Sequence, residues 1–333
     1  MADLPEQYKK DPDLWLKGFR VDETIDPKTL CHRILIHDVD VLSPFGFDLK
    51  GTFESGQCFR WKAVDENRYF GIVRGKAVVV SLYEKKHLLI ENATAEDFSE
   101  IWYDYFDLST NYASIIRQVD KDGFMHESVS FSGGARLLRQ DFEEVLFSYI
   151  LSAQNNIPRI KKLIESLCER YGDPIPGNAP DAGPAYSFPA ATVLSRQFCP
   201  ENRPGCRSGN LCGNPFGGYR CPYIRSTAEL LATQQIVPDF ELLADSGAKE
   251  ARRQMCRFPG VGEKVADCVL LYSGIRKDLC PVDTWVEKTI QSRYLGKAAT
   301  KNEIRAFTES YFGRYAGYAQ LWFFYYARNH SIR

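Results

Sequence analysis

The spacing of apolar residues divides the chain into two regions with different predicted secondary structure. Between residues 31 and about 83, short segments alternate apolar with polar positions or are apolar throughout: "RILIHDVDVL", "QCFRWKAV", "RYFGIVR" and "KAVVVSLY". Their length and their Val, Ile, Phe and Tyr content are typical of β-strands, and "DEN" and "RGK" between them predict turns. After residue 131, apolar residues recur at helical spacing almost to the end. We therefore expect an α+β protein, in which an antiparallel sheet domain with helices precedes an all-helical domain.

The same pattern predicts the limits of these parts. Residues 1–30 are charged and weakly periodic, which predicts an N-terminal extension with one short helix. Residues 31–130 are expected to form the sheet domain with its helices. Residues 131–333 are expected to form the helical domain, which contains a Cys-containing insertion at about 196–216.

Composition narrows the class of protein. Hydrophobic residues make up 44% of the chain and aromatic residues 13%, which suits a globular protein rather than a disordered one. No apolar run reaches membrane-spanning length and the first residues lack the apolar centre of a secretory signal, so we expect an intracellular protein that binds no membrane. The net charge of −1 combines 16 basic and 23 acidic residues up to position 130 with 26 and 20 after it. The second part is therefore suited to face a polyanion, although a random split of surface charge explains the count equally well.

The segment "FPGVGEKVADC" contains a tight turn followed directly by a predicted helix. Pro259 ends the preceding helix, and Gly260 and Gly262 permit backbone angles and close approaches that a Cβ would block. Such a turn points unpaired N–H groups of the next helix outward, where together with the helix dipole they bind anions such as phosphate. An ordinary tight connection between helices also accounts for the glycines.

Three side chains with useful chemistry follow this turn. Lys264 lies in the first turn of the helix, where the dipole disfavours a cation and favours the neutral, nucleophilic amine. Cys268 lies one helical turn later and shares a face with the lysine. Asp283, in "CPVDTW", stands at the predicted start of the next helix, where a carboxylate is a natural cap.

This stretch resembles the helix-hairpin-helix and Gly/Pro…Asp motif of DNA base-excision glycosylases, in the branch that carries the lysine of bifunctional glycosylase/lyases. Six further segments are similar to 8-oxoguanine DNA glycosylases in their bacterial form: "SGQCFRW", "WYDYFDL", "GARLLRQD", "FSYILSAQNNIPRI", "GGYRCPYI" and "GYAQLWFFYYAR". The resemblance runs from about Phe47 to Asn329 in the family's order. It implies that Lys264 attacks C1′ of the damaged nucleotide and that Asp283 stabilises the positive charge that develops on the sugar.

The resemblance also implies a pocket for the damaged base, which must leave the stack to be reached. Cys268 and Phe324 would hold the two faces of the flipped base. Gln320 would read its Watson–Crick edge, and the carbonyl of Gly56 would accept the N7 proton that 8-oxoguanine carries and guanine lacks. Taken alone, the spacing of Gln320 and Phe324 fits an ordinary amphipathic helix, and Gly56 fits a strand bulge.

Further contacts with DNA follow from the same resemblance. Five residues would fill the gap left by the base, wedge into the duplex or contact the orphaned cytosine: Gln154, Asn155, Arg159, Tyr219 and Arg220. Gly260 and Gly262 would contact phosphate. The chain departs from the animal form at two positions. It has Gln154 where the animal form more often has asparagine, and Trp285 where the animal form has histidine. Arg159 is kept, so we expect a preference for cytosine opposite the lesion.

Two places are candidate metal sites, although the resemblance implies that the chemistry requires no cofactor. The main-chain carbonyls of Cys256, Phe258 and Val261 match positions that hold a cation in the family's hairpin. Four cysteines follow the spacing Cys-x6-Cys-x5-Cys-x8-Cys: Cys199, Cys206, Cys212 and Cys221. Four thiolates could hold zinc, but the spacing lacks the close pairs of zinc knuckles, and ordinary thiols are the alternative.

These observations predict a bifunctional DNA glycosylase that excises 8-oxoguanine from double-stranded DNA, preferably opposite cytosine, and cleaves the abasic site by β-elimination through a lysine Schiff base. We expect a monomer in the bacterial cytoplasm or, in a eukaryote, the nucleus. Two alternatives stay open: the same scaffold with another base specificity, and a non-catalytic DNA-binding module. The second would not need Lys264 and Asp283 together, so trapping a covalent complex with borohydride separates it from an enzyme.

Overall fold

The computed structural model describes residues 14–176, 184–198 and 218–332. Seven strands form one antiparallel sheet in the order β1-β2-β3-β7-β6-β5-β4. The strands are β1 (Leu14–Leu16), β2 (Phe19–Ile25), β3 (His32–Ile36), β4 (Trp61–Ala63), β5 (Arg68–Val73), β6 (Lys76–Tyr83) and β7 (His87–Glu91). Ile90 in β7 pairs with Ile34 on one side and Val80 on the other, and this row of fully buried aliphatic side chains runs across the middle of the sheet.

The first two strands correct the expectation of an N-terminal extension with a short helix. Residues 14–25 belong to the sheet, because β1 pairs with β2 and Val21 of β2 pairs with Ile36. Phe19 and Val21 are buried, and Asp22, which follows Val21, is also buried and has His37 as its partner, with Nε2 of His37 2.7 Å from the carboxylate. The many charged residues in this segment obscured the alternation of apolar and polar positions from which a strand is predicted. Residues 1–13 of the expected extension lie outside the described residues.

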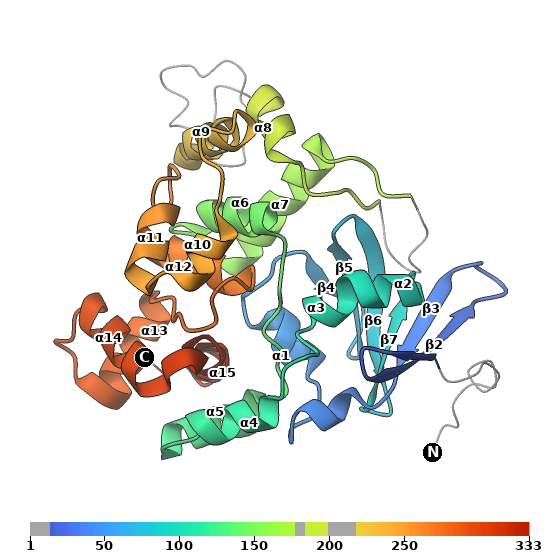
Figure 1. Cartoon of the computed structure of the whole chain (residues 1–333), viewed down its shortest axis with the longest axis horizontal. Coiled ribbons are helices and arrows are strands. Elements are labelled where there is room, and N and C mark those ends of the chain that lie inside the picture. The colour runs from blue at the N-terminus through green and yellow to red at the C-terminus, as the bar shows by residue number, and fades with distance from the viewer. Residues whose placement is uncertain (1–13, 177–183, 199–217, 333) are drawn as a thin grey trace.

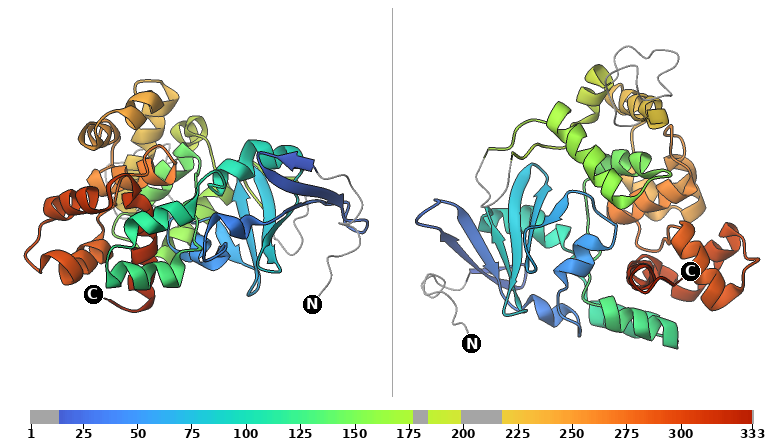
Figure 2. Two further views of the ribbon diagram at one scale, coloured as in Figure 1. Left: turned by 60° about the horizontal axis from the view of Figure 1, so that its bottom comes forward. Right: turned by 180° about the vertical axis from the view of Figure 1, so that it is seen from behind.

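Short helices cover the sheet and build its core. They are η2 (Val39–Leu42), α1 (Leu49–Glu54), α2 (Ala95–Asp97), η3 (Phe98–Trp102) and α3 (Tyr103–Tyr105). Phe53 of α1 stacks on Trp61 with ring centres 4.0 Å apart, and Trp102 stacks on Phe106. In Figures 1 and 2, α1 lies between the sheet and the helical domain, so the loop that follows it can reach both.

The helical domain forms a second core. Its described helices are α4 (Tyr112–Val119), α5 (Gly123–Ser132), α6 (Phe142–Ser152), α7 (Ile157–Tyr171), α8 (Ala191–Gln197), η5 (Gly218–Arg220), α9 (Cys221–Ala232), α10 (Phe240–Asp245), α11 (Ala248–Met255), α12 (Glu263–Tyr272), α13 (Thr284–Ile290), η6 (Gln291–Leu295), α14 (Lys301–Phe312), η7 (Gly313–Tyr315) and α15 (Ala316–Asn329). α4 and α5 belong to this core and not to the sheet, since α5 packs along α15 (Figure 1). The helical packing therefore begins near residue 112, earlier than the expected boundary at 130. In the described ranges, no helix combines the length and the apolar character needed to cross a membrane.

Candidate active site

The hairpin before α12 is built as a tight turn that leaves the helix start uncapped by any side chain. Gly260 has a φ of +82°, and a Cβ there would lie 2.8 Å from the Cβ of Tyr223 in α9, so the turn requires glycine. Thr227 of α9 donates a hydrogen bond to the Pro259 carbonyl at 3.1 Å and ties the hairpin to that helix. Gly262 is the exposed N-cap of α12 and supplies no side-chain cap. The geometry is that of an anion-binding helix start, and the phosphate contacts of Gly260 and Gly262 stay a prediction.

Lys264 and Asp283 face a common cavity from two neighbouring helix starts. Lys264, in the first turn of α12, is partly buried, with its Nζ 5.1 Å from the centre of the Tyr149 ring in α6. Asp283 is the N-cap of α13, and its Oδ1 accepts the amide N–H groups of Trp285 at 2.9 Å and Val286 at 2.8 Å. Burial raises the pKa of Asp283, although the hydrogen bonds from these amides and the charge of Lys264 act to lower it. The carboxylate is thus fixed in orientation next to the amine.

Both catalytic candidates and the four expected base-pocket residues line one small cavity of about 40 Å³. Its walls are Gly56, Tyr149, Lys264, Cys268, Tyr272, Pro281, Asp283, Gln320 and Phe324. It adjoins a larger cavity of about 710 Å³, which falls in the range of small-ligand pockets. The two share five wall residues: Gly56, Tyr149, Lys264, Asp283 and Phe324. A base in the larger cavity would therefore lie against Gly56, Lys264, Asp283 and Phe324, which both cavities share.

Two tyrosines that were not singled out from the sequence fix the polar groups of this pocket. Gly56 has a φ of +93°, and its carbonyl accepts a hydrogen bond from the Tyr149 hydroxyl at 3.1 Å. The Tyr272 hydroxyl donates to Oε1 of Gln320 at 3.2 Å, and Gln320 is only 3% exposed. The two tyrosine rings stack with centres 5.5 Å apart, and burial raises the pKa of both phenols well above the ordinary value. Each phenol therefore keeps its proton and acts as a donor.

Cys268 contributes an apolar surface to the pocket. Its side chain is buried, and burial raises the pKa of the thiol to about 12, although the neighbouring Lys264 charge opposes this. A thiol with that pKa is neutral at physiological pH. Cys268 is thus a packing group at this site, which leaves the amine of Lys264 as the candidate nucleophile.

The expected gap-filling residues follow α6 on an exposed loop. Gln154 is exposed and has a φ of +49°, a backbone conformation that residues other than Gly, Asn and Asp rarely adopt. Asn155 donates from its side chain to the Leu151 carbonyl at 3.3 Å and lines the larger cavity. Arg159 is exposed on the first turn of α7. Of the three, Asn155 lines the larger cavity, while Gln154 and Arg159 are exposed in the segment that supplies part of its wall.

Tyr219 and Arg220 reach the same loop from η5. The Tyr219 hydroxyl donates to the Ala153 carbonyl at 3.2 Å, and the ring is 41% exposed. Arg220 is 5% exposed, donates from Nε to the same carbonyl at 2.8 Å and stacks its guanidinium 4.4 Å from the Tyr219 ring centre. In this structure Arg220 braces the loop, and its contact with an orphaned base stays a prediction.

Comparison with known proteins decides which family this arrangement belongs to. The family model of the 8-oxoguanine DNA glycosylase N-terminal domain matches residues 41–146. The chain is 31% identical over 294 residues to N-glycosylase/DNA lyase OGG1 of Arabidopsis thaliana, covering 82% of this chain and 75% of the plant protein. A probable N-glycosylase/DNA lyase of Methanothermobacter thermautotrophicus is 27% identical over 86% of this chain and 95% of its own length.

The chain belongs to the 8-oxoguanine DNA glycosylase family. Among solved structures, the Clostridium acetobutylicum 8-oxoguanine glycosylase/lyase in complex with DNA that carries cytosine opposite 8-oxoguanine is 31% identical, with a TM-score of 0.79 over 94% of this chain and 98% of that one. The structure of MBOgg1 in complex with a low-affinity DNA ligand is 34% identical, with a TM-score of 0.78 over 93% and 99%. These matches confirm the predicted family and the α+β fold, and they make the chain a DNA N-glycosylase with lyase activity.

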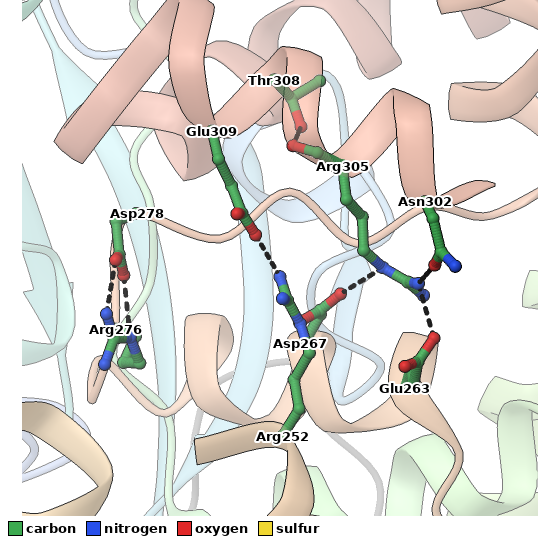
Figure 3. A network of polar contacts seen from close by, with 9 residues as sticks. All are labelled: Arg252, Glu263, Asp267, Arg276, Asp278, Asn302, Arg305, Thr308 and Glu309. Atoms are coloured by element: carbon green, nitrogen blue, oxygen red, sulfur yellow. Dashed lines mark hydrogen bonds and ion pairs between the residues drawn. The ribbon is translucent and has the colours of Figure 1, made fainter. Parts of the chain in front are cut away.

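A buried ionic network supports the helix that carries the lysine of this glycosylase (Figure 3). Asp267 of α12 is fully buried, and its Oδ1 accepts a hydrogen bond from Nε of Arg252 in α11 at 2.5 Å. Its Oδ2 lies 3.5 Å from Nε of Arg305 in α14, which also donates to Glu263 at 2.5 Å. Arg252 in turn donates to Glu309 of α14 at 2.5 Å. The network joins three helices, and Asp267 follows Lys264 by three residues in α12.

The metal sites expected for the glycosylase stay predictions. Cys199, Cys206 and Cys212 lie outside the described residues, and Cys221 is buried at the first position of α9. In the ranges that the structure describes, no three His, Cys, Asp or Glu side chains are grouped so that they could hold a metal ion. In the hairpin, the Phe258 carbonyl accepts the Val261 N–H at 3.1 Å, which leaves it a second lone pair for a cation shared with the carbonyls of Cys256 and Val261.

Proposed function

We propose that this chain excises 8-oxoguanine from double-stranded DNA, preferably opposite cytosine, and then cleaves the abasic site through a Schiff base on Lys264. The observation that carries the proposal is the convergence of Lys264, Asp283 and the four base-pocket residues on one cavity. Gly56 and the catalytic pair are more than two hundred residues apart in sequence, so the fold brings them together. The solved complex of the Clostridium relative with a lesion opposite cytosine supports the substrate.

The geometry supports a direct displacement at the sugar. The neutral amine of Lys264 forms a bond to C1′ while the bond from C1′ to the base breaks, and the electron pair leaves with the base, which takes up a proton. Asp283, held by two amides, stabilises the positive charge that builds up on the sugar. Transfer of the amine proton to O4′, with opening of the C1′–O4′ bond, gives the Schiff base and a free 4′-hydroxyl. Removal of a C2′ proton then expels the 3′ phosphate by cleavage of the C3′–O bond.

The pocket supports selection of 8-oxoguanine over guanine by one hydrogen bond. A base that carries a proton on N7 can donate it to the Gly56 carbonyl, which has a second lone pair beside the one that Tyr149 uses. Guanine would place the lone pair of N7 against that carbonyl, and a buried unpaired acceptor costs about 1–3 kcal/mol. The buried amide of Gln320 would contact the Watson–Crick edge of the base, and Cys268 and Phe324 would hold its two faces.

Covalent trapping tests the chemical role of Lys264. Lys264→Gln is expected to bind lesion-containing duplex with little change and to give no borohydride-trapped adduct, because the amide cannot form a Schiff base. Lys301→Gln, an exposed lysine on α14, is the matched control and is expected to trap like the parent protein. Strand cleavage by Lys264→Gln at the parent rate would refute the assignment.

Excision from duplexes with 8-oxoguanine opposite each of the four bases tests the opposite-base preference. We expect the highest kcat/KM with cytosine, because the exposed guanidinium of Arg159 offers paired donors to a base edge. Equal rates for all four duplexes would contradict the preference and leave the excision itself intact. Gel filtration of the same preparation tests the expected monomer.

A further inference from the structure

Arg328 is a partly buried cation in the wall of the larger cavity, and its role was not predicted from the sequence. It continues a stripe on α15, since Gln320, Phe324 and Arg328 follow each other at intervals of four residues and share a face of the helix. Its guanidinium lies 5.7 Å from the centre of the Phe324 ring. It lines the cavity together with Gly56, Lys264 and Asp283.

The two ends of this guanidinium have different environments. Nη2 donates to the carbonyl of Glu54, the last residue of α1, and so fixes the loop that carries Gly56. Nη1 is buried and has no hydrogen-bond partner among the residues that the structure describes. A buried donor without an acceptor is costly, and it points to a partner that binds later.

The position of Nη1 indicates which partner this is. A Cβ built on Gly56 would lie 3.3 Å from Nη1 and 3.7 Å from the Phe324 ring, with Ile157 on the other side at 3.2 Å. Nη1 therefore lies next to the backbone of Gly56, whose carbonyl is the proposed acceptor for N7–H. Gly56, Phe324 and Arg328 all line the larger cavity, so a base that enters it and lies against Gly56 comes close to this donor.

We propose that Arg328 is a specificity-determining residue that donates a hydrogen bond from Nη1 to the 8-oxo oxygen of the extruded base. In 8-oxoguanine, the N7–H donor and the O8 acceptor are neighbours on one edge. The Gly56 carbonyl and Nη1 form the complementary pair of acceptor and donor. Guanine presents an acceptor and a C–H at the same positions, so the pair discriminates twice. This inference rests on the proposed function, since it assigns a contact within the same excision reaction.

Comparing base excision with cleavage of a preformed abasic site tests the contact. In single-turnover reactions, Arg328→Met is expected to slow excision of 8-oxoguanine opposite cytosine about 10- to 100-fold, the range for loss of a charged hydrogen bond. The same variant is expected to cleave an abasic-site duplex within about twofold of the parent rate, since that substrate has no base. Arg68→Gln, a partly exposed arginine in the sheet far from the cavity walls, is the matched control for loss of a positive charge.

A second substrate separates direct contact with O8 from support of the loop. In 8-thioguanine, N7–H is kept and the oxygen is replaced by sulfur, a weaker acceptor. The parent protein is expected to excise 8-oxoguanine faster than 8-thioguanine, and Arg328→Met is expected to lose most of this difference. Arg328→Lys can still donate to the Glu54 carbonyl and controls for misfolding. Its rate of 8-oxoguanine excision is expected to lie between those of the parent protein and Arg328→Met.

Three results would overturn the proposal: an unchanged excision rate in Arg328→Met, an equal loss on the abasic-site duplex, or the same ratio of oxygen to sulfur substrate in variant and parent. Failure of the proposed function looks different, because the parent protein would then excise neither modified base. The two failures can therefore be told apart in one set of reactions.

Discussion

At the scale of single residues, the site places two possible nucleophiles one helical turn apart and gives them different environments. Lys264 is partly exposed to the cavity, while Cys268 is buried and its pKa is raised to about 12. At pH 8 an ordinary thiol with a pKa of 9.0 is about one-tenth thiolate, whereas the fraction for Cys268 is about one in ten thousand. The raised pKa means that the reactive form appears only as the pH approaches 12.

We therefore expect Cys268 to resist iodoacetamide in the native protein at pH 8 and to react on unfolding. Cys256, which is exposed, is the internal control and is expected to be alkylated in the native state, as mass spectrometry of the two peptides can show. Alkylation of both at the same rate would mean that the thiol in the pocket is accessible and ionised. Cys268 would then have to be reconsidered as a nucleophile beside Lys264.

Arg328 shows why some site residues could not be predicted one at a time. In the sequence it is an arginine near the end of a helix, where a cation is favoured by the helix dipole and needs no other explanation. Its role depends on Glu54, 274 residues away, and on a glycine whose missing side chain leaves room for its Nη1. The resemblance located Lys264, Cys268, Asp283, Gln320 and Phe324 because their motifs are local. The partners that orient them, Tyr149 and Tyr272, became visible only in the fold.

At the scale of elements, apolar periodicity predicted that the chain is helical almost to its end after residue 131. The described part of this region is built of helices, the last of which, α15, ends at Asn329. Several elements were missed, among them β7, which lies beyond the region of predicted strands. β1 and β2 combine few apolar positions with many charges, and they are strands only because β3 supplies a partner. α5 shows weak periodicity because its apolar face is short and it is held by α15.

The support of α12 depends on a buried carboxylate, and its removal is expected to be costly. Asp267→Ala would leave the buried guanidinium groups of Arg252 and Arg305 without their shared partner, which should lower the free energy of unfolding by about 3 kcal/mol. Urea unfolding measures this change. Glu250→Ala is the matched control, since Glu250 pairs with the adjacent and exposed Arg253 of the same helix and should cost far less.

The same carboxylate predicts a dependence of stability on pH. Burial raises the pKa of Asp267 from 3.8 to about 6, although Arg252 and Arg305 oppose the shift. The folded state then binds the proton more tightly than the unfolded state, so this residue's contribution to stability is fully present below about pH 4 and is lost as the pH rises through about 6. Asp267→Ala should remove this component from the pH profile of urea unfolding. An unchanged profile would assign the slope to other groups.

At the scale of the whole molecule, the site lies where two separate cores meet, so its geometry depends on how they are joined. Asp107 is fully buried at this junction, between Phe106 and Leu108 of the sheet core. Four of the groups that donate to its carboxylate come from the helical domain and the segments that border it: Tyr112 at 3.1 Å, Arg139 at 2.8 Å, Lys277 at 3.0 Å and Tyr318 at 2.9 Å. Lys277 lies between α12 and α13, the helices that present Lys264 and Asp283.

Asp107→Asn is expected to weaken this joint and, through it, the alignment of the site. The amide keeps the shape but loses the charge that two cations share, and we expect a loss of about 2–4 kcal/mol in the free energy of unfolding, measured with guanidinium chloride. The rate of excision should also fall at temperatures where the variant is still folded. Gly56 is held on the sheet side of the joint and Lys264 on the helical side, so a weaker joint misaligns them. Asp104→Asn is the control, since Asp104 is half-exposed and lies 3.9 Å from the same Arg139. If both variants excised 8-oxoguanine at the parent rate, the two cores would be held in register by apolar packing, and the buried carboxylate would matter for stability alone.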